Sequence, residues 1–124
     1  MATILAAGED YSALAIAAAT IEGEGHRVIT ADNGLDAYQM VLSEKPDLAI
    51  LEVTMPIFNG FETCTMILDD PEVPKDFPVI LLTVEPIDSR KMEQVGAADQ
   101  LPKVHSSIEL RDMLVRYLGD KAAV

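Results

Sequence analysis

The sequence predicts an α/β fold in which a five-stranded parallel sheet is covered by helices on both faces. Short apolar runs alternate five times with longer amphipathic segments along the chain. Two of these runs, Leu48–Leu51 and Val79–Leu82, are apolar at every position. Continuous apolar runs are typical of strands that are buried on both faces, as in parallel sheets. Successive strand–helix units imply parallel strands that are joined by right-handed crossovers.

The expected elements follow in chain order. We expect strands over Thr3–Ala7, Arg27–Thr30, Leu48–Leu51, Pro78–Leu82 and Asp99–Leu101. We expect helices over Tyr11–Glu24, Gly34–Ser43, Gly60–Asp69, Ser89–Val95 and Ser107–Leu118. Residues that commonly flank helices support these limits. They are Gly25 after the first helix, Asn33-Gly34 and Asn59-Gly60 at the second and third, and Ser106-Ser107 at the last.

Length and composition limit the domain count and the location. A chain of 124 residues suffices for one sizeable core, so we expect residues 1–124 to form a single domain. No apolar run approaches the roughly 18–20 residues of a membrane span, and the first residues lack the basic region of a signal peptide. The single cysteine, Cys64, excludes an internal disulfide and a cysteine metal cluster. These features favour a cytoplasmic protein.

The net charge limits the class of partner. It is −12 at neutral pH, with 21 acidic and 9 basic residues. Such a charge argues against direct contact with nucleic acid or with an anionic membrane surface, because both carry negative charge themselves. We therefore expect protein partners or a small molecule.

Polar residues follow the ends of four expected strands. Glu9 and Asp10 follow the first strand, Glu52 the third, Thr83 the fourth and Lys103 the fifth. In a parallel sheet these positions lie at one edge, where function gathers in open α/β folds. Carboxylates can hold Mg²⁺ through oxygen ligands, while a lysine and a hydroxyl can stabilise charge on a transferring group. The combination is typical of a phosphoryl site, although each residue alone has an ordinary structural explanation.

Three segments together make the chain similar to the receiver domains of two-component response regulators. They are Pro46–Gly60, Pro78–Thr83 and Gly96–Lys103, which resemble the third strand with its loop, the fourth strand and the fifth strand of that family. The resemblance implies a doubly wound, flavodoxin-like fold with strand order 2-1-3-4-5. It also implies a role in phosphorelay signal transduction, with a sensor kinase or an output domain as partner.

At the position of Glu52, the resemblance implies an aspartate that accepts the phosphoryl group. Glutamate is longer by one methylene, which displaces the carboxylate by about 1.5 Å. Because a misplacement near 1 Å can cost on the order of 10²-fold in rate, we expect phosphoryl transfer to be lost. The same position would make Glu52 a partial imitation of the phosphorylated state.

The first acidic loop also departs from the family pattern. The family has two acids there, whereas this chain has Gly8 followed by Glu9. Asp10 is adjacent, but by the ungapped register we expect it to point elsewhere. We therefore expect no cofactor, with Mg²⁺ binding weak or lost and only Glu9 and Glu52 left to hold the ion. Without a metal, Lys103 becomes the expected ion-pair partner of Glu52.

Further departures lie at the fourth and fifth strands. Val84 stands where the family favours a very small residue, and Gln100 replaces the aromatic switch residue. Val104 replaces the usual proline after the lysine. In the third loop, Ile57 and Phe58 are bulky and apolar, which indicates either an interaction patch or a locally buried loop.

Three functional hypotheses remain open. The first is a pseudo-receiver that is not an enzyme and acts, independently of phosphorylation, through protein contacts on the face of its fourth helix, fifth strand and fifth helix. The alternative is a receiver that still engages a sensor kinase, with Glu52 as a constitutive partial mimic of the phosphorylated state. The third is a ligand-binding or enzymatic domain on the same fold, for which no nucleophile–base pair or Gly-rich phosphate loop is found.

Overall fold

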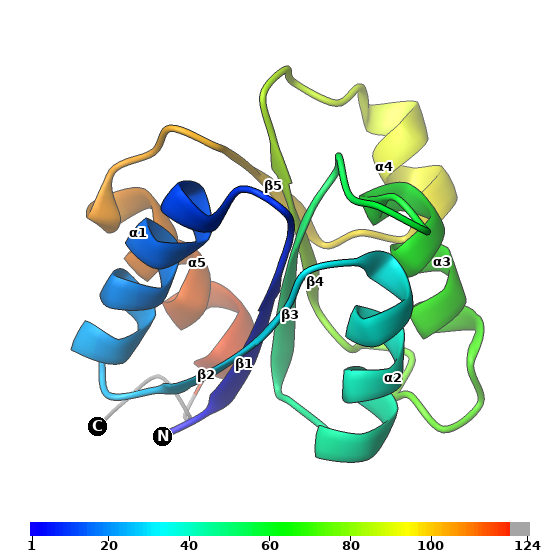
Figure 1. The fold of residues 1–124 in the computed structure, drawn as a ribbon, viewed down its shortest axis with the longest axis horizontal. Helices are drawn as coiled ribbons and strands as arrows, with labels where there is room; N and C mark the ends of the chain where they lie inside the picture. The colour runs from blue at the N-terminus through cyan, green and yellow to red at the C-terminus, as the bar shows by residue number, and fades with distance from the viewer. Residues whose placement is uncertain (120–124) are drawn as a thin grey trace.

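The fold is the five-stranded parallel α/β sheet that the sequence predicts (Figure 1). A computed structural model describes residues 1–119. Its strands are β1 (Thr3–Ala7), β2 (Arg27–Ala31), β3 (Leu48–Glu52), β4 (Val79–Thr83) and β5 (Asp99–Pro102). Its helices are α1 (Tyr11–Gly23), α2 (Gly34–Glu44), α3 (Gly60–Asp69), α4 (Ser89–Val95) and α5 (Ser107–Leu118). Each limit lies within one residue of the expected one.

The strand order is β2-β1-β3-β4-β5, which confirms the doubly wound arrangement. Helices α1 and α5 cover one face of the sheet, and α2, α3 and α4 cover the other (Figure 1). Alternate residues of β1 point into the two hydrophobic cores. Leu5 belongs to the core on the side of α2, α3 and α4, and Ile4 belongs to the core on the side of α1 and α5. Every residue of β3 and β4 is buried, which the apolar runs Leu48–Leu51 and Val79–Leu82 predict for all but the last residue of each strand.

The strand register brings the carboxyl ends of the strands to one edge. Ala7 of β1 lies beside Leu51 of β3, and Thr83 of β4 lies beside Pro102 of β5. Residues that directly follow these strands therefore gather around the end of β3. The last residue of that strand is Glu52. The sheet thus places an acid at the centre of this edge.

Side-chain caps fix where the helices begin. Asp10 accepts a hydrogen bond from the Ala13 N–H at the start of α1, and Asn33 does the same for α2. Asn59 at α3 forms a capping box, in which side chain and backbone bond reciprocally. Such caps satisfy N–H groups that have no partner within the helix. They therefore anchor the loops that follow β1, β2 and β3.

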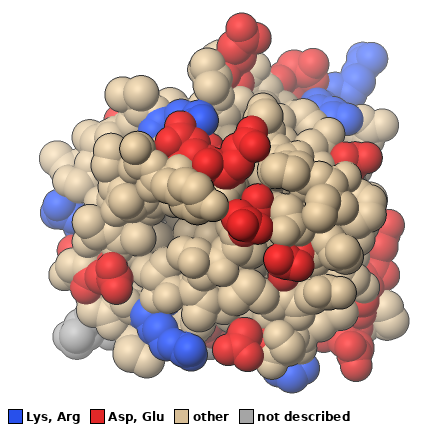
Figure 2. Space-filling view, viewed as in Figure 1, with Lys and Arg blue, Asp and Glu red and all other residues tan. Residues whose placement is uncertain are grey.

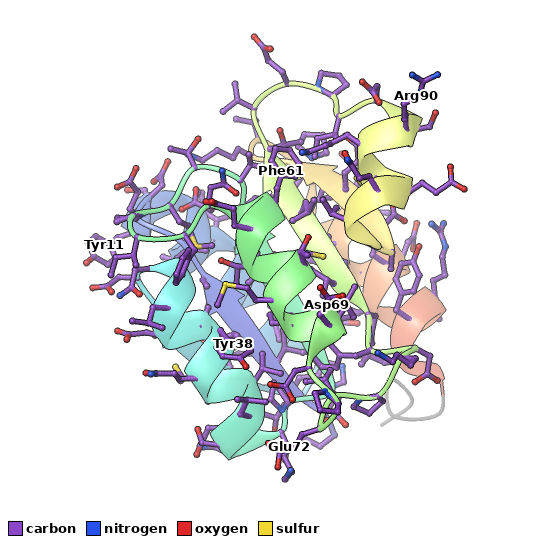
Figure 3. The ribbon with its side chains drawn as sticks, turned by 90° about the vertical axis from the view of Figure 1, so that its right-hand side faces the viewer. Tyr11, Tyr38, Phe61, Asp69, Glu72 and Arg90 are labelled. Carbon is purple, nitrogen blue, oxygen red and sulfur yellow. The ribbon has the colours of Figure 1, made fainter. Side chains whose placement is uncertain are left out.

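Helices α2, α3 and α4 lie side by side in front of the sheet when the molecule is viewed from the face that they cover (Figure 3). Tyr38 of α2 donates a hydrogen bond to the carboxylate of Asp70, just beyond α3, and so ties these two helices together. Within residues 1–119, no helix has the length and apolar character that crossing a membrane requires.

Candidate functional site

The Glu52 carboxylate is buried, and both of its oxygens have partners. The residue is only 2% exposed. Oε1 accepts a hydrogen bond of 2.9 Å from the backbone N–H of Asp10, and Oε2 lies 3.1 Å from Nζ of Lys103. A buried carboxylate is costly unless it is paired and hydrogen-bonded. The expected ion pair between Glu52 and Lys103 is therefore confirmed, and a backbone donor adds to it.

Gly8 provides the space for this buried side chain. A Cβ atom at position 8 would lie 1.9 Å from Oε1 of Glu52 and 2.4 Å from its Cγ. Neither distance is compatible with van der Waals contact. The Glu52 side chain thus occupies the volume that any other residue at position 8 would need. The two departures noted in the sequence are one structural feature.

Asp10 belongs to the same cluster, so the expectation that it points elsewhere is wrong. Its Oδ1 accepts a bond of 3.1 Å from the Ala13 N–H, and its Oδ2 lies 2.9 Å from Nζ of Lys103. The cause is its role as the cap of α1, because a capping carboxylate turns back over the first N–H groups of the helix. That end of α1 follows β1 directly and lies at the sheet edge where β5 delivers Lys103.

Lys103 binds two carboxylates at once, and this changes its protonation equilibrium and that of Asp10. The hydrogen bond to Asp10, followed by that to Glu52, raises the pKa of Lys103. The hydrogen bond from Lys103 is the largest cause that lowers the pKa of Asp10. The lysine side chain is 26% exposed and that of Asp10 is 40% exposed, whereas that of Glu52 is buried. Lys103 is therefore a fixed cation between two anions.

Glu9 lies outside this cluster. Its side chain is exposed, and within residues 1–119 it forms no hydrogen bond or ion pair with Glu52 or Lys103. Across the same residues, no three His, Cys, Asp or Glu side chains are grouped so that they could hold a metal ion. The carboxylates beside Lys103 are thus those of Glu52 and Asp10.

A small pocket of about 210 Å³ adjoins the cluster. Glu52, Thr83, Val84 and Lys103 are among its lining residues. The Thr83 hydroxyl donates a hydrogen bond of 2.6 Å to the backbone carbonyl of Glu85, so it is engaged by its own loop. Val84 is 80% exposed. The sequence-predicted hydroxyl and lysine therefore share a pocket, but each already has a partner.

Gln100 fixes the loop between β4 and α4. Its Nε2 donates a bond of 2.8 Å to the carbonyl oxygen of Ile87, and its Oε1 accepts one of 2.7 Å from the N–H of the same residue. A side-chain amide that pairs with both the N–H and the carbonyl of one residue imitates the backbone hydrogen bonding between two β-strands. Together with the Thr83 bond, this pair holds residues 85 and 87 in place. The sequence placed a switch residue at position 100 but did not predict this contact.

The third loop is not buried as a whole. Ile57 is 65% exposed and has a φ of 70°, a left-handed conformation that is rare for a β-branched residue. Phe58 is partly buried. The loop therefore combines an exposed aliphatic residue with a partly buried aromatic one.

Sequence reasoning missed two features of the site. One is the backbone N–H of Asp10, which no side-chain pattern reveals. The other is the exchange of volume between Gly8 and Glu52, for which a signal existed: a residue without a side chain accompanied a longer acid at the same sheet edge. Cys64, in contrast, carries no chemistry here, since it is buried and desolvation raises its pKa to about 12.

Comparisons with known proteins agree with this architecture. The family model described as "Response regulator receiver domain" matches residues 4–115. Protein PilH of Pseudomonas aeruginosa is 32% identical over 83% of this chain and 86% of its own length. Response regulator MprA of Mycobacterium leprae is 31% identical over 97% of this chain, which spans only 54% of that protein. The structure of the chemotaxis protein CheY4 of Vibrio cholerae is 28% identical with a TM-score of 0.87, over 94% of this chain and 98% of that one.

Proposed function

Since this chain belongs to the response regulator receiver domains of two-component signalling, we propose that it is a pseudo-receiver, which signals without accepting a phosphoryl group. It is not an enzyme and works through protein contacts with a sensor kinase or an output domain. The phosphoacceptor aspartate of the family is replaced by Glu52. With a net charge of −12, the domain makes no direct contact with nucleic acid or membrane, and it functions in the cytoplasm.

The observation that carries this proposal is the state of the Glu52 carboxylate. It is buried, with one oxygen on the Asp10 N–H and the other on Lys103. A nucleophilic carboxylate must present an accessible lone pair to the donor phosphorus in a near-attack geometry. Here the Glu52 carboxylate is 2% exposed and held on both oxygens, and moving it out to meet a donor would break its contacts with Lys103 and the Asp10 N–H. The carboxylate therefore serves as a structural anion.

The metal that the family implies does not fit these residues. Mg²⁺ requires nearly octahedral oxygen ligands at about 2.0–2.1 Å and usually keeps several waters. The two carboxylates of the cluster are held by a lysine, and Glu9 is exposed away from their contacts. Mg²⁺ would have to displace a cation that is already bound on both sides. We therefore assign no cofactor, and Mg²⁺ binds weakly or not at all.

The decisive experiment measures phosphoryl uptake. The protein is incubated with acetyl phosphate and Mg²⁺ and its intact mass is recorded, with no added phosphoryl group as the expected result. The matched control is the double variant Gly8→Asp/Glu52→Asp, which replaces the longer acid and fills the space it leaves. A labile phosphoryl group that maps to Glu52 in the unaltered chain would overturn the proposal.

Mg²⁺ binding is measured separately by titration calorimetry at low millimolar concentration. The expected result is no saturable heat. A saturable signal that disappears in Glu9→Ala would contradict the assignment, because it would place Glu9 at a functional metal site.

A second candidate is favoured by the contact between Lys103 and Glu52. This contact gives Lys103 a permanent anionic partner, as a phosphorylated residue would, so Glu52 acts as a constitutive partial mimic. A sensor kinase would then bind the domain without transferring a phosphoryl group to it. Co-purification of a sensor kinase with the unaltered chain that is lost for Glu52→Gln supports this candidate. A partner, kinase or output domain, that the unaltered chain and Glu52→Gln capture equally supports the first.

A further inference from the structure

A groove of about 770 Å³ lies between α1 and α2, on the side of the molecule where β2 forms the edge of the sheet. Strand β2 runs in front of β1 between these helices (Figure 1). The groove is lined from all three elements and from the loop after β2. Its lining residues include Tyr11, Leu14, Ala15, Thr30, Asp32 and Met40. It is separate from the pocket beside Glu52, with which it shares no residue.

The outer edge of β2 offers backbone hydrogen-bonding groups to this groove. β2 pairs only with β1 in the described part of the sheet. The N–H of Arg27 donates to Ala2, and the carbonyl of Ala31 accepts from Gly8, so these two residues face β1. Because alternate residues of a strand direct their backbone groups to opposite sides, Val28 and Thr30 face outward. Such an edge is a template for a further strand.

On the α1 side, the groove is lined by apolar residues, and some of them have small side chains. Leu14 is buried at the base, while Ala15 is exposed and has only a methyl side chain. No charged residue occurs in α1 from Tyr11 to Ile21. Tyr11 at the start of α1 is 71% exposed (Figure 3). A chain that lies along β2 could therefore approach closely and bury apolar side chains against α1.

The charged residues around the groove determine which charge a bound segment would carry. Between residues 10 and 44 the only Lys or Arg is Arg27, which lies 4.0 Å from Glu44. The same segment contains six acids, of which Asp10, Glu24 and Glu44 are ion-paired with Lys103, Arg111 and Arg27; the other three are Glu22, Asp32 and Asp36. Asp32 and Asp36 line the groove itself. On this face, a group of acidic side chains lies near the middle with one basic group directly beside it, and further acidic and basic side chains lie around the rim (Figure 2).

These charges argue against an acidic occupant. A second copy of this chain would bring another net charge of −12 to an acidic groove, and like charges that are brought together oppose binding. A cationic segment would be attracted instead.

We propose that this groove binds an extended segment of a partner protein, which carries Lys or Arg residues and adds to β2 as a sixth strand. Its backbone pairs with Val28 and Thr30, its apolar side chains contact α1, and its cations lie near Asp32 and Asp36. Strand addition obtains affinity from the backbone bonds and specificity from alternate side chains. The inference rests on the proposed function, because it gives the class of partner that such a signalling module would bind.

The test starts from a phage-displayed library of random twelve-residue peptides, selected on the unaltered protein. Enriched peptides are expected to carry Lys or Arg between aliphatic residues. On binding, they should protect the Thr30 N–H from hydrogen exchange. Asp32→Asn/Asp36→Asn should weaken binding roughly tenfold, which a titration resolves easily. The matched control, Glu72→Gln/Glu93→Gln, removes two exposed acids elsewhere and should leave the affinity unchanged.

Two further variants separate strand addition from a general charge effect. Thr30→Pro removes an outward N–H, which an edge strand tolerates, and should abolish binding. If this variant does not fold, Ala15→Lys decides, because it places a cation and a long side chain at an exposed position in the groove. The proposal is overturned if no peptide is enriched or if the bound peptide is helical. It is also overturned if enriched peptides bind Ala15→Lys, and Thr30→Pro where that variant folds, as tightly as they bind the unaltered protein. None of these measurements involves phosphoryl transfer, so uptake of phosphate would refute the proposed function and leave the groove result intact.

Discussion

The Glu52 side chain fills the space that Gly8 leaves open. A Cβ at position 8 would stand 1.9 Å from Oε1 of Glu52, and the same oxygen accepts the Asp10 N–H at 2.9 Å. The absence of a side chain after β1 therefore permits a longer acid at the end of β3, its neighbour in the sheet. This acid in turn holds Lys103 and the start of α1. The following predictions test whether these contacts have the energetic consequences that the geometry implies.

Gly8→Ala should destabilise the fold by about 1–3 kcal/mol, because the added methyl group overpacks the site of Glu52. The measurement is the free energy of unfolding in urea. Gly23→Ala is the matched control: a Cβ there meets nothing within 4 Å, and alanine favours the helix, so stability should rise slightly. In a Glu52→Ala background the cost of Gly8→Ala should shrink. Equal costs in both backgrounds would contradict direct competition for space.

Lys103→Met should destabilise the protein by about 2–3 kcal/mol, between the ~0–1 of a surface pair and the roughly 3–5 of a broken buried pair. The reason is that Glu52, 2% exposed, would keep only the Asp10 N–H as a donor. Glu52→Gln should recover part of the loss in that background, and a double-mutant cycle measures the coupling. As a control, Arg27→Met breaks an exposed pair of 4.0 Å and should have little effect. Absence of coupling would show that the pair contributes nothing to stability.

Gln100→Ala should release the loop between β4 and α4. It removes both hydrogen bonds to the backbone of Ile87, each of which is worth roughly 0.5–1.5 kcal/mol. Hydrogen exchange should accelerate at the Ile87 N–H more than in the strands. Gln94→Ala, at an exposed position of α4, is the control and should leave this rate unchanged. If the two variants exchange alike, the Gln100 contact does not restrain the loop.

Lowering the pH below about 6.5 should destabilise the fold through His26. This residue is 5% exposed, and its Nδ1 accepts a bond of 3.0 Å from the Ala2 N–H. Burial, followed by the N-terminal amine, lowers its pKa from 6.5, while Glu24 and Asp47 oppose the shift. The unfolded chain therefore binds the proton first as the pH falls, and stability decreases until the folded state also titrates.

The control for this pH dependence is His26→Asn, which retains an acceptor but does not titrate. The free energy of unfolding is compared at about pH 7.5 and 5.5 for both proteins. The unaltered chain should lose more stability between these conditions than the variant does. An identical loss would assign the effect to the carboxylates instead.

The sequence alone determined the class of fold and which strand ends form the site. Two continuously apolar runs and five strand–helix units suffice for this, because burial on both faces and right-handed crossovers leave few alternative arrangements. The same two observations place Glu52, Thr83 and Lys103 at one edge of the sheet. The pairing of Glu52 with Lys103 followed from opposite charges at that edge.

Only the tertiary structure decided how the site residues bind one another. The direction of the Asp10 carboxylate depends on its role as a helix cap, and its backbone N–H reaches Glu52 only because α1 begins beside β3. The sequence lists Gly8 and Glu52 as separate departures 44 positions apart, whereas packing makes them a single exchange of volume. Contacts of this kind depend on ångström-scale positions of the backbone. Patterns of residue type and spacing do not fix these positions.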